Sequence, residues 1–453
     1  MKSEVVICGA GIAGISAAYH LASQYGLRNI LLVDERPALS LTSDKSTECY
    51  RNWWPGPGDA MVALMNRSIE LMEELARQSS NRFLLNRRGY LYLTADLNQA
   101  SKMREAAEAT SKLGGGPLRV YTGGPDDPDY LPSPGEGFED VPEGADLLLD
   151  PDLLHTHFLG LSENIVAGLH VRKAGWFRAQ QLGMLLLERA RACGVQLVNG
   201  RVTEVMVAGG RVRGIQLADG RRIETGVFVN AAGALLKQVG RMLGVDLPVF
   251  SELHLKAAVN DPLGILPRNS PLLIWNDGQR LPWTEEERHI LEEEEMSWLL
   301  EPFPGGVHTR PEGGEGSQSV LMLWEYHPQV MEPIFPPPLD PQYPELALRG
   351  LSAMLPGFRQ YFEHMPRPSI DGGYYTKTAE NRPLIGPLPV EGAYIIGALS
   401  GFGLMASCAS GELLAAHLAG GKLPRYTPAF ALERYEDPQY RKVLTEWGDG
   451  GQL

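Results

Sequence analysis

The chain has 453 residues, of which 43% are hydrophobic and 21% are charged, and its formal net charge at pH 7 is −14. This length predicts two or three domains, each with a core of its own. The acidic balance, without a basic stripe for phosphates, argues against a nucleic-acid partner. No apolar run reaches the roughly 18 residues that cross a bilayer, so no membrane span is expected.

The four cysteines, Cys8, Cys49, Cys193 and Cys408, show neither a C-x-x-C pair nor the spacing of metal ligands. No metal site is therefore predicted. The first apolar strand begins almost at residue 1, which leaves no room for a secretory or transit segment. These features favour a reducing cytoplasm.

The first 36 residues carry the most informative pattern. An apolar run at 5–8 leads into the sequence GAGIAG at 9–14, an alanine-rich helical pattern follows, and a second apolar run at 29–33 ends in an acidic pair. Strand, glycine turn, helix, strand and acid, in this order, form the dinucleotide-binding fingerprint. A structural glycine turn alone does not account for the acid at Glu35.

Each residue of the fingerprint has a physical task. Gly9 is expected to make the tight turn, Gly11 to let the backbone approach a pyrophosphate, and Gly14 to pack the helix against the strand. The helix N-terminus offers N–H groups to the phosphates. Glu35 follows Gly14 by about 20 residues, where an acid binds the ribose.

The next elements follow in chain order. Residues 37–58 form an extended polar segment, and the apolar stripe that starts at residue 59 predicts a helix. A strand is expected over 90–93 and a helix over 100–113. Residues 114–145 are rich in glycine, proline and aspartate and predict a long surface loop.

The middle of the chain is predicted to revisit the nucleotide domain. A helix over 179–193 leads into strands at 195–198, 202–208, 211–217 and 227–230. Farther on, strand-like segments alternate with proline-rich and acidic loops and predict a separate antiparallel sheet; these segments are 253–259, 272–275 and 320–324. A strand at 393–397 and a helix from 403 to about 418 then close the nucleotide domain.

The predicted fold class is α/β plus α+β, with a Rossmann-like domain and a second, antiparallel-sheet substrate domain. The nucleotide domain is expected from residues 1–86, 150–247 and 366–453, and the substrate domain from 87–149 and 248–365. The chain has no second G-x-G-x-x-G sequence, which indicates one dinucleotide rather than a flavin together with NADPH.

Three motifs together resemble one enzyme family. They are the fingerprint with its acids, the Asn-Ala-Ala-Gly turn at 230–233, and the Arg-Pro-Leu-Ile-Gly and Ser-Gly-Phe-Gly sequences within 382–403. They are similar to the D-amino acid oxidase superfamily, which includes sarcosine oxidase, dimethylglycine dehydrogenase and glycine oxidase. The stretch 375–378 also resembles monomeric sarcosine oxidase. The resemblance implies bound FAD and oxidation of a C–N bond.

The resemblance also implies the FAD site. Its expected residues are Gly9, Gly11, Ile12, Ala13, Gly14, Asp34, Glu35, Arg36, Ser43, Lys45, Ser46, Thr47, Val202, Ala232, Gly233, Gly401, Phe402, Gly403, Leu404 and Met405. The helix that opens at 401–404 would point its N-terminus at the flavin. That end of a helix stabilises negative charge, which agrees with a reduced flavin.

Three residues are expected to be catalytic by the same resemblance. Arg51 falls where the family has an arginine for the substrate carboxylate, although a structural salt bridge is an equal alternative. His327 matches a histidine of the catalytic site, although it could be a surface histidine before Pro328. Tyr375 is the third. Glu48, Trp53 and Met405 are expected in the substrate pocket.

The sequence also departs from the family. Met405 and Leu323 stand where lysines bind the carboxylate and activate oxygen, and Gly373 stands where a cysteine links to the flavin. No histidine of the covalent linkage precedes Arg51. Non-covalent FAD is therefore predicted, and sarcosine is not the expected substrate. Lys256 could replace the missing charge, although a solvent-facing lysine is the simpler expectation.

The predicted reaction is oxidation of an amine or amino acid, with a hydride passing to flavin N5 and the imine then hydrolysing. Glu48, Glu325 and Glu380 are candidates to attract a cationic amine. Oxygen or another acceptor would take the electrons, and the oligomeric state is not predicted. The alternatives are an FAD-dependent 2-hydroxy acid or polyol dehydrogenase, an NAD(P) enzyme, and a flavoprotein subunit that transfers electrons within a complex.

Overall fold

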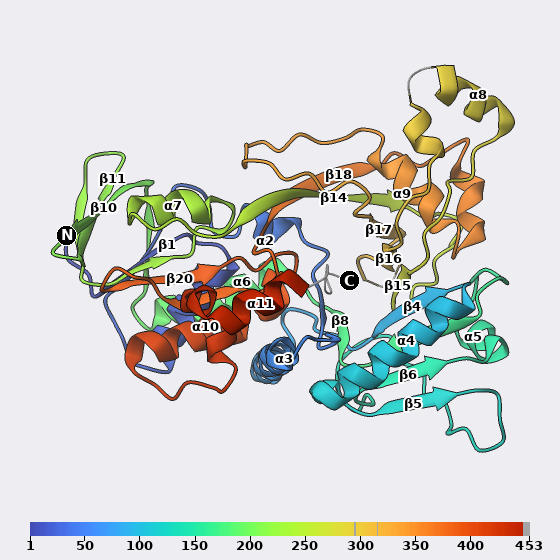
Figure 1. The fold of residues 1–453 in the computed structure, drawn as a ribbon, viewed down its shortest axis with the longest axis horizontal. Coiled ribbons are helices and arrows are strands. Elements are labelled where there is room, and N and C mark those ends of the chain that lie inside the picture. Colours follow the sequence, from blue (N-terminus) through green and yellow to red (C-terminus); the bar gives the residue numbers. More distant parts are fainter. Residues whose placement is uncertain (294–295, 315, 447–453) are drawn as a thin grey trace.

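The computed structural model describes residues 1–293, 296–314 and 316–446. A six-stranded sheet lies toward one end of the molecule and a nine-stranded sheet toward the other (Figure 1). The long strands β14 (Phe250–Asn260) and β18 (Ser369–Lys377) extend between the two regions. This arrangement confirms the predicted fold class, a Rossmann-like domain with a second, mostly antiparallel sheet.

The six-stranded sheet has the order β19-β20-β13-β1-β2-β9, in which β19 is antiparallel to β20 and the other neighbours are parallel. Its strands are β1 (Val5–Cys8), β2 (Ile30–Asp34), β9 (Gln196–Asn199), β13 (Phe228–Asn230), β19 (Leu384–Pro387) and β20 (Ala393–Gly397). Both faces are covered, as parallel sheets require.

Alternate side chains of β1 enter different cores. Val5 and Ile7 pack with four helices, whereas Val6 and Cys8 pack against a small antiparallel sheet and a short helix. The four helices are α1 (Ile12–Ser23), α3 (Ala60–Gln78), α6 (Ala179–Ala192) and α10 (Gly403–Ala419). The opposite face carries β10 (Val202–Ala208), β11 (Arg211–Leu217), β12 (Arg222–Glu224) and α7 (Leu236–Met242).

The nine-stranded sheet has the order β18-β14-β17-β16-β15-β4-β7-β6-β5. Its other strands are β4 (Tyr90–Thr94), β5 (Leu118–Tyr121), β6 (Ala145–Leu148), β7 (Ala167–Val171), β15 (Leu272–Trp275), β16 (Val307–Pro311) and β17 (Ser319–Leu323). One core holds α4 (Leu97–Thr110), and the other holds α5 (Pro151–His157), α8 (Glu285–Glu293) and α9 (Tyr343–Leu351).

Most predicted elements are present. Corrections are needed for the two segments at 37–58 and 114–145 and for the domain boundaries. The expected loop at 114–145 contains β5, and the extended segment at 37–58 contains α2 (Thr42–Lys45) and β3 (Cys49–Arg51), which pairs with β8 (Ala174–Trp176). These short elements gain stability from tertiary pairing, which local composition does not reveal.

The expected domain boundaries also differ from the sheets. β7 and β18 lie in the nine-stranded sheet, although residues 150–247 and 366–453 were assigned to the nucleotide domain. Both strands pair with non-local partners, so the sequence around them shows no boundary signal. Helix α11 (Pro438–Glu446) follows the final sheet strand. Residues 447–453 of the same assignment lie outside the described part.

Among the described residues, no helix is both long and apolar enough to cross a membrane. Within the same residues, no group of histidine, cysteine, aspartate or glutamate side chains is arranged to hold a metal ion.

Candidate active site

The turn between β1 and α1 has the conformation that the fingerprint requires. Gly9 has a φ of +117°, and a Cβ atom there would lie 2.3 Å from the carbonyl oxygen of Ala231. A Cβ atom at Gly14 would lie 2.0 Å from the carbonyl oxygen of Gly9. Both positions therefore demand glycine, the first for its backbone conformation and the second for the close packing of helix on strand.

The two acids at the end of β2, Asp34 and Glu35, have different contacts. The Asp34 carboxylate accepts hydrogen bonds from the backbone N–H of Ala10 at 2.8 Å and of Arg36 at 2.9 Å, so it fixes the glycine turn. The Glu35 side chain is 42% exposed, and its ion pair with Arg201 is loose, at 3.6 Å. Glu35 is therefore the acid that remains available to a ribose.

A cavity of about 300 Å³ begins at this turn and follows the carboxyl ends of β1 and β2. We call it the nucleotide cavity. Its lining includes many of the expected cofactor residues, namely Gly9, Gly11, Asp34, Glu35, Arg36, Ser43, Val202, Ala232 and Gly233. The carboxyl ends of parallel strands are the usual place for a nucleotide in such a sheet.

A second cavity, of about 90 Å³, adjoins the first and is called the inner cavity. The two share the lining residues Gly11, Thr42, Ser43, Ala231, Gly233 and Ala234. The inner cavity adds the expected residues Ile12, Ala13, Ser46, Tyr375, Gly401, Gly403 and Leu404. Together the cavities connect the nucleotide fingerprint with the C-terminal glycine turn, as a long dinucleotide would require.

Several expected cofactor residues line neither cavity. Lys45 forms ion pairs with Asp371 at 3.0 Å and Asp44 at 3.2 Å. The carbonyl of Thr47 accepts hydrogen bonds from Arg310 at 3.0 and 2.7 Å. These contacts hold the segment after α2 against the nine-stranded sheet, which is a structural task.

Two expected residues of the C-terminal turn are likewise buried away from both cavities. Phe402 packs edge to face on Trp54, with ring centroids 5.1 Å apart, and Met405 lies in the helical core. Met405 is therefore misplaced as a substrate contact. Leu399, Ser400, Gly401, Gly403 and Leu404 line the inner cavity, whereas Phe402 and Met405 point into the helical core.

Tyr375, which the sequence analysis expected to be catalytic, lines the inner cavity. Its ring rests against Gly401, where a Cβ atom would approach the ring to 2.4 Å. On its other side the ring stacks on the imidazole of His254, with centroids 3.8 Å apart and planes 16° apart. Burial, together with the nearby Glu325 carboxylate, raises the pKa of Tyr375 and keeps the phenol protonated.

His254 was not predicted from the sequence. It lies between two carboxylates, with Nε2 3.1 Å from Glu252 and Nδ1 2.8 Å from Glu325. Burial opposes its charge, but Glu325 and Glu252 outweigh this effect and raise the pKa of the imidazole. Lys377 also binds Glu252 at 2.6 Å, so the cluster balances its charges. Although burial favours the neutral acid, His254 and Lys377 lower the pKa of Glu252 to about 2.

Arg51 is buried on β3, and its guanidinium lies over the ring of Trp54, 4.7 Å from the centroid. Its Nε donates to the carbonyl of Trp53 at 3.3 Å. Trp53 itself is buried in the core beneath the nine-stranded sheet. The other side of this link is Phe402: Trp54 contacts both Arg51 and Phe402, so it connects Arg51 with the C-terminal glycine turn.

His308, on β16, belongs to the same buried region. Burial and the charge of Arg51 lower its pKa, although Glu325 and a contact with the Gly306 carbonyl, 2.8 Å from Nδ1, oppose this. Tyr92 lies in the same row across the sheet, since Ile274 pairs with both residues. The buried Tyr92 hydroxyl makes no hydrogen bond within the described residues. A buried polar atom of this kind is a candidate ligand contact.

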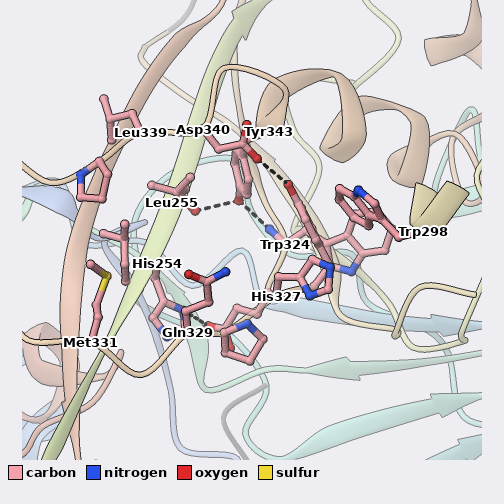
Figure 2. Close-up of a pocket in the computed structure, with 15 residues that line it drawn as sticks. His254, Leu255, Trp298, Trp324, His327, Gln329, Met331, Leu339, Asp340 and Tyr343 are labelled. Atoms are coloured by element: carbon pink, nitrogen blue, oxygen red, sulfur yellow. Dashed lines mark hydrogen bonds and ion pairs between the residues drawn. The ribbon is translucent and has the colours of Figure 1, made fainter. Parts of the chain in front are cut away.

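His327 lies elsewhere. It is exposed beyond the end of β17, next to Trp298 with ring centroids 4.9 Å apart, and it lines an outer pocket rather than the inner cavity (Figure 2). His327 does not face the inner cavity, because the chain leaves the sheet after Leu323. Its alternative reading, a surface histidine before Pro328, fits the structure.

The three glutamates expected to attract an amine have other partners. Glu48 accepts the N–H of Ala179 at 2.9 Å and lies 3.7 Å from Arg310. Glu380 is buried and binds Arg434 at 2.7 Å. Glu325, as described, binds His254. Glu325 alone borders the region of Tyr375, so the expectation for Glu48 and Glu380 is wrong in position.

Lys256 is not the solvent-facing lysine that the sequence favoured. Its Nζ donates to the carbonyl of Ser46 at 2.9 Å, and burial lowers its pKa. Ser46 lines the inner cavity, and Leu323 is the register partner of Lys256 on β17. Lys256 therefore brings a positive charge close to the inner cavity, where the family lysine is missing.

Comparisons with known proteins agree with this geometry. The family model described as "DAO: FAD dependent oxidoreductase" matches residues 4–417. Dimethylglycine dehydrogenase from Rattus norvegicus is 22% identical over 98% of this chain and 45% of its own length, and sarcosine oxidase subunit beta from Arthrobacter sp is 23% identical over 57% of each chain. The chain thus spans about half the length of these curated relatives.

Solved structures show the same fold at low identity. L-proline dehydrogenase from P. horikoshii has a TM-score of 0.73 at 19% identity, with 96% of this chain and 98% of that chain covered. Glycine oxidase from Bacillus cereus has a TM-score of 0.69 at 15% identity, with coverage of 95% and 98%.

Proposed function

Because the chain belongs to the family of FAD-dependent oxidoreductases, we propose that it binds FAD non-covalently along the two adjoining cavities and oxidises a C–N bond of an amine or amino acid. The observation that carries the proposal is the continuity between the fingerprint turn and the inner cavity that ends at Tyr375 and Gly401. A side chain at Gly9, Gly14 or Gly401 would collide with neighbouring atoms, so the shape of the two cavities depends on these glycines.

Bound FAD supplies the hydride acceptor, and the surrounding residues orient the substrate and hold its charges. We propose that the Arg51 guanidinium, whose forked shape matches a carboxylate, binds the carboxylate of the substrate. Lys256 places positive charge on the sheet side of the inner cavity, which would stabilise negative charge gained by the cofactor. The imine product then hydrolyses in water.

We assign to His308 the proton-accepting role that resemblance suggested for His327. Its lowered pKa keeps the imidazole neutral near pH 7. If Nδ1 donates to the Gly306 carbonyl, Nε2 is the basic nitrogen. A neutral histidine within the electrostatic influence of Arg51 can take the proton of a substrate ammonium and release the lone pair that C–N oxidation needs.

The residue at the possible linkage position supports the proposal of non-covalent binding. Gly373 carries no thiol, and a side chain there would press on Lys45, whose Cβ lies 2.9 Å from an ideal Cβ position. Acid precipitation tests this point. We expect the yellow cofactor in the supernatant, whereas colour in the pellet would show a covalent bond.

Anaerobic mixing with amines, N-methyl amino acids and hydroxy acids tests the reaction. We expect one amine class to bleach the flavin absorbance and to release a free amine or ammonia, and later admission of air separates oxygen from another acceptor. Bleaching by a hydroxy acid alone would overturn the assignment in favour of C–O oxidation. A protein that takes up no FAD would overturn it entirely.

A further inference from the structure

The ladder between β14 and β17 stops abruptly at the pair Lys256 and Leu323. The next pair would be Leu255 and Trp324, but the hydroxyl of Tyr343 lies between their backbones. The Trp324 N–H donates to this hydroxyl at 2.8 Å, and the hydroxyl donates to the Leu255 carbonyl at 2.7 Å (Figure 2). Tyr343 thus satisfies both backbone groups while it holds the two strands apart.

The outer pocket that His327 lines is a cavity of about 400 Å³, and it opens where the strands part. We call it the vestibule. Its lining combines aromatic rings with apolar side chains and two carboxylates; the rings are Trp298, Trp324, Tyr326, His327 and Tyr343. Figure 2 shows Trp298, Trp324, His327 and Tyr343 gathered around the opening, together with Leu339, Met331 and Gln329 from the proline-rich segment that follows β17.

The inner wall of the vestibule is the His254–Glu325 pair. Glu325 follows β17 and His254 lies on β14, so their 2.8 Å contact spans the same gap that Tyr343 holds open. The imidazole borders the vestibule and also stacks on Tyr375, which borders the inner cavity. These two stacked rings therefore lie between the vestibule and the inner cavity.

The charge of the vestibule favours a cation. Asp340 lines it, accepts the N–H of Gln342 at 2.9 Å, and forms no ion pair within the described residues. The Tyr326 hydroxyl lies 3.5 Å from its other oxygen. The negative charge of Glu325 is balanced by His254, so Asp340 is the carboxylate of the vestibule that we expect to bind a cation. The faces of tryptophan and tyrosine attract the same kind of group.

We propose that the vestibule binds a protonated amine that carries a bulky apolar group and that it is the passage by which this substrate reaches the inner cavity. The inference rests on the proposed amine oxidation and names its substrate class. Asp340 binds the ammonium, the aromatic rings pack on the apolar group, and a joint shift of the His254–Glu325 pair and the Tyr375 ring opens the way to the inner cavity.

Binding to the FAD-free protein tests the site without any reaction. Calorimetric titration would compare tryptamine, a cationic aromatic amine, with indole-3-acetate, its anionic counterpart, at constant ionic strength. We expect tryptamine to bind about tenfold more tightly, and Asp340→Asn to remove this preference. Asp126→Asn, which changes an exposed loop residue elsewhere, should leave it intact. Equal binding of the two probes, or an unaltered preference in Asp340→Asn, would overturn the proposal.

The passage is tested by blocking it. Cys8, Cys49 and Cys408 are buried, so a Cys193→Ser background permits selective maleimide labelling of Gln329→Cys at the rim. In the FAD-loaded protein we expect the label to slow anaerobic flavin reduction by the best amine at least about tenfold, with FAD content unchanged. Labelled Ser101→Cys, on the outside of α4, is the matched control.

The two proposals fail differently. If no amine reduces the flavin but the Asp340-dependent preference for tryptamine persists, the proposed reaction is wrong and the binding site stands. If an amine reduces the flavin at the same rate in both labelled proteins, the reaction stands and the passage is refuted.

Discussion

The imidazole of His254 and the phenol ring of Tyr375 stack face to face, with centroids 3.8 Å apart. This contact joins a buried charge cluster to the wall of the inner cavity, because His254 is held between Glu252 and Glu325 while Tyr375 rests on Gly401. A positive charge is thus fixed behind an uncharged ring that faces the cavity. The ion pairs of this unit depend on the protonation of His254.

Replacement of Glu325 by glutamine should therefore have a pH-dependent cost. The pKa of His254 is raised in the folded protein, so its ion pairs stabilise the fold fully below the unfolded pKa of about 6.5 and lose this effect as pH rises through the folded value. We expect Glu325→Gln to lower the free energy of unfolding by about 2 kcal/mol near pH 6 and by less near pH 9. Urea unfolding at both pH values measures the difference.

The exposed pair of His289 and Glu293, 3.3 Å apart, provides the control. Glu293→Gln should change the free energy of unfolding little at either pH, because exposed pairs contribute at most about 1 kcal/mol. A cost for Glu325→Gln that is the same at both pH values would contradict a charged His254.

Gly14→Ala should impair both folding and FAD uptake. The added methyl group would lie 2.0 Å from the Gly9 carbonyl oxygen, so helix α1 must move away from β1. We expect a loss of about 1–3 kcal/mol in the free energy of unfolding and weaker FAD binding. Gly26→Ala is the control, since Gly26 has a φ of +71° and open space around it. That variant should lose about 1 kcal/mol and keep its FAD affinity.

Glu35→Gln should weaken FAD binding without harm to the fold. The carboxylate is exposed and only loosely paired, so its main interaction is expected to be with the ribose hydroxyls. Loss of a charged hydrogen bond predicts about tenfold weaker binding in a fluorescence titration. Glu204→Gln, on the exposed side of β10, should leave the affinity unchanged. An unaffected Glu35→Gln would show that the nucleotide lies elsewhere.

Glu380→Gln separates a structural glutamate from a substrate contact. Its Oε1 accepts hydrogen bonds from Arg434, Tyr435 and Tyr440, and although burial opposes its charge, Arg434 lowers its pKa. We expect a loss of about 3–5 kcal/mol in the free energy of unfolding, because Arg434 remains buried and unpaired. At temperatures where the variant is folded, the rate of flavin reduction should equal that of the unaltered protein.

The FAD fingerprint could be predicted because its residues are close together in sequence and each has a local reason. Gly9 is required by its φ of +117° and Gly14 by its close contact with the Gly9 carbonyl, both within one β-α unit, and Glu35 follows at a fixed spacing. The His254 cluster could not be predicted in the same way, since its members come from β14, β18 and the segment after β17. One signal was present, however: Glu252, His254 and Lys256 alternate along a strand and so share a face of the sheet.

His327 illustrates the opposite error. Resemblance placed it at the end of a strand that would face the cofactor, but the register of β17 ends at Leu323 and the chain then turns outward. The cause is the Tyr343 hydroxyl from α9, which interrupts the ladder. A contact from a distant helix leaves no trace in the local sequence, so the loss of register was not predictable.

Arg51→Lys tests whether the substrate carries a carboxylate. The lysine keeps the positive charge but loses the forked pair of donors, so binding of a carboxylate should weaken while the charge of the region stays the same. We expect the concentration for half-maximal flavin reduction to rise at least about tenfold for an N-methyl amino acid and to change little for the matching amine without a carboxylate. Arg82→Lys, an exposed residue paired with Glu188, should alter neither value. Equal effects of Arg51→Lys on both compounds would assign Arg51 to the packing of Trp54 instead, because the guanidinium also covers that ring.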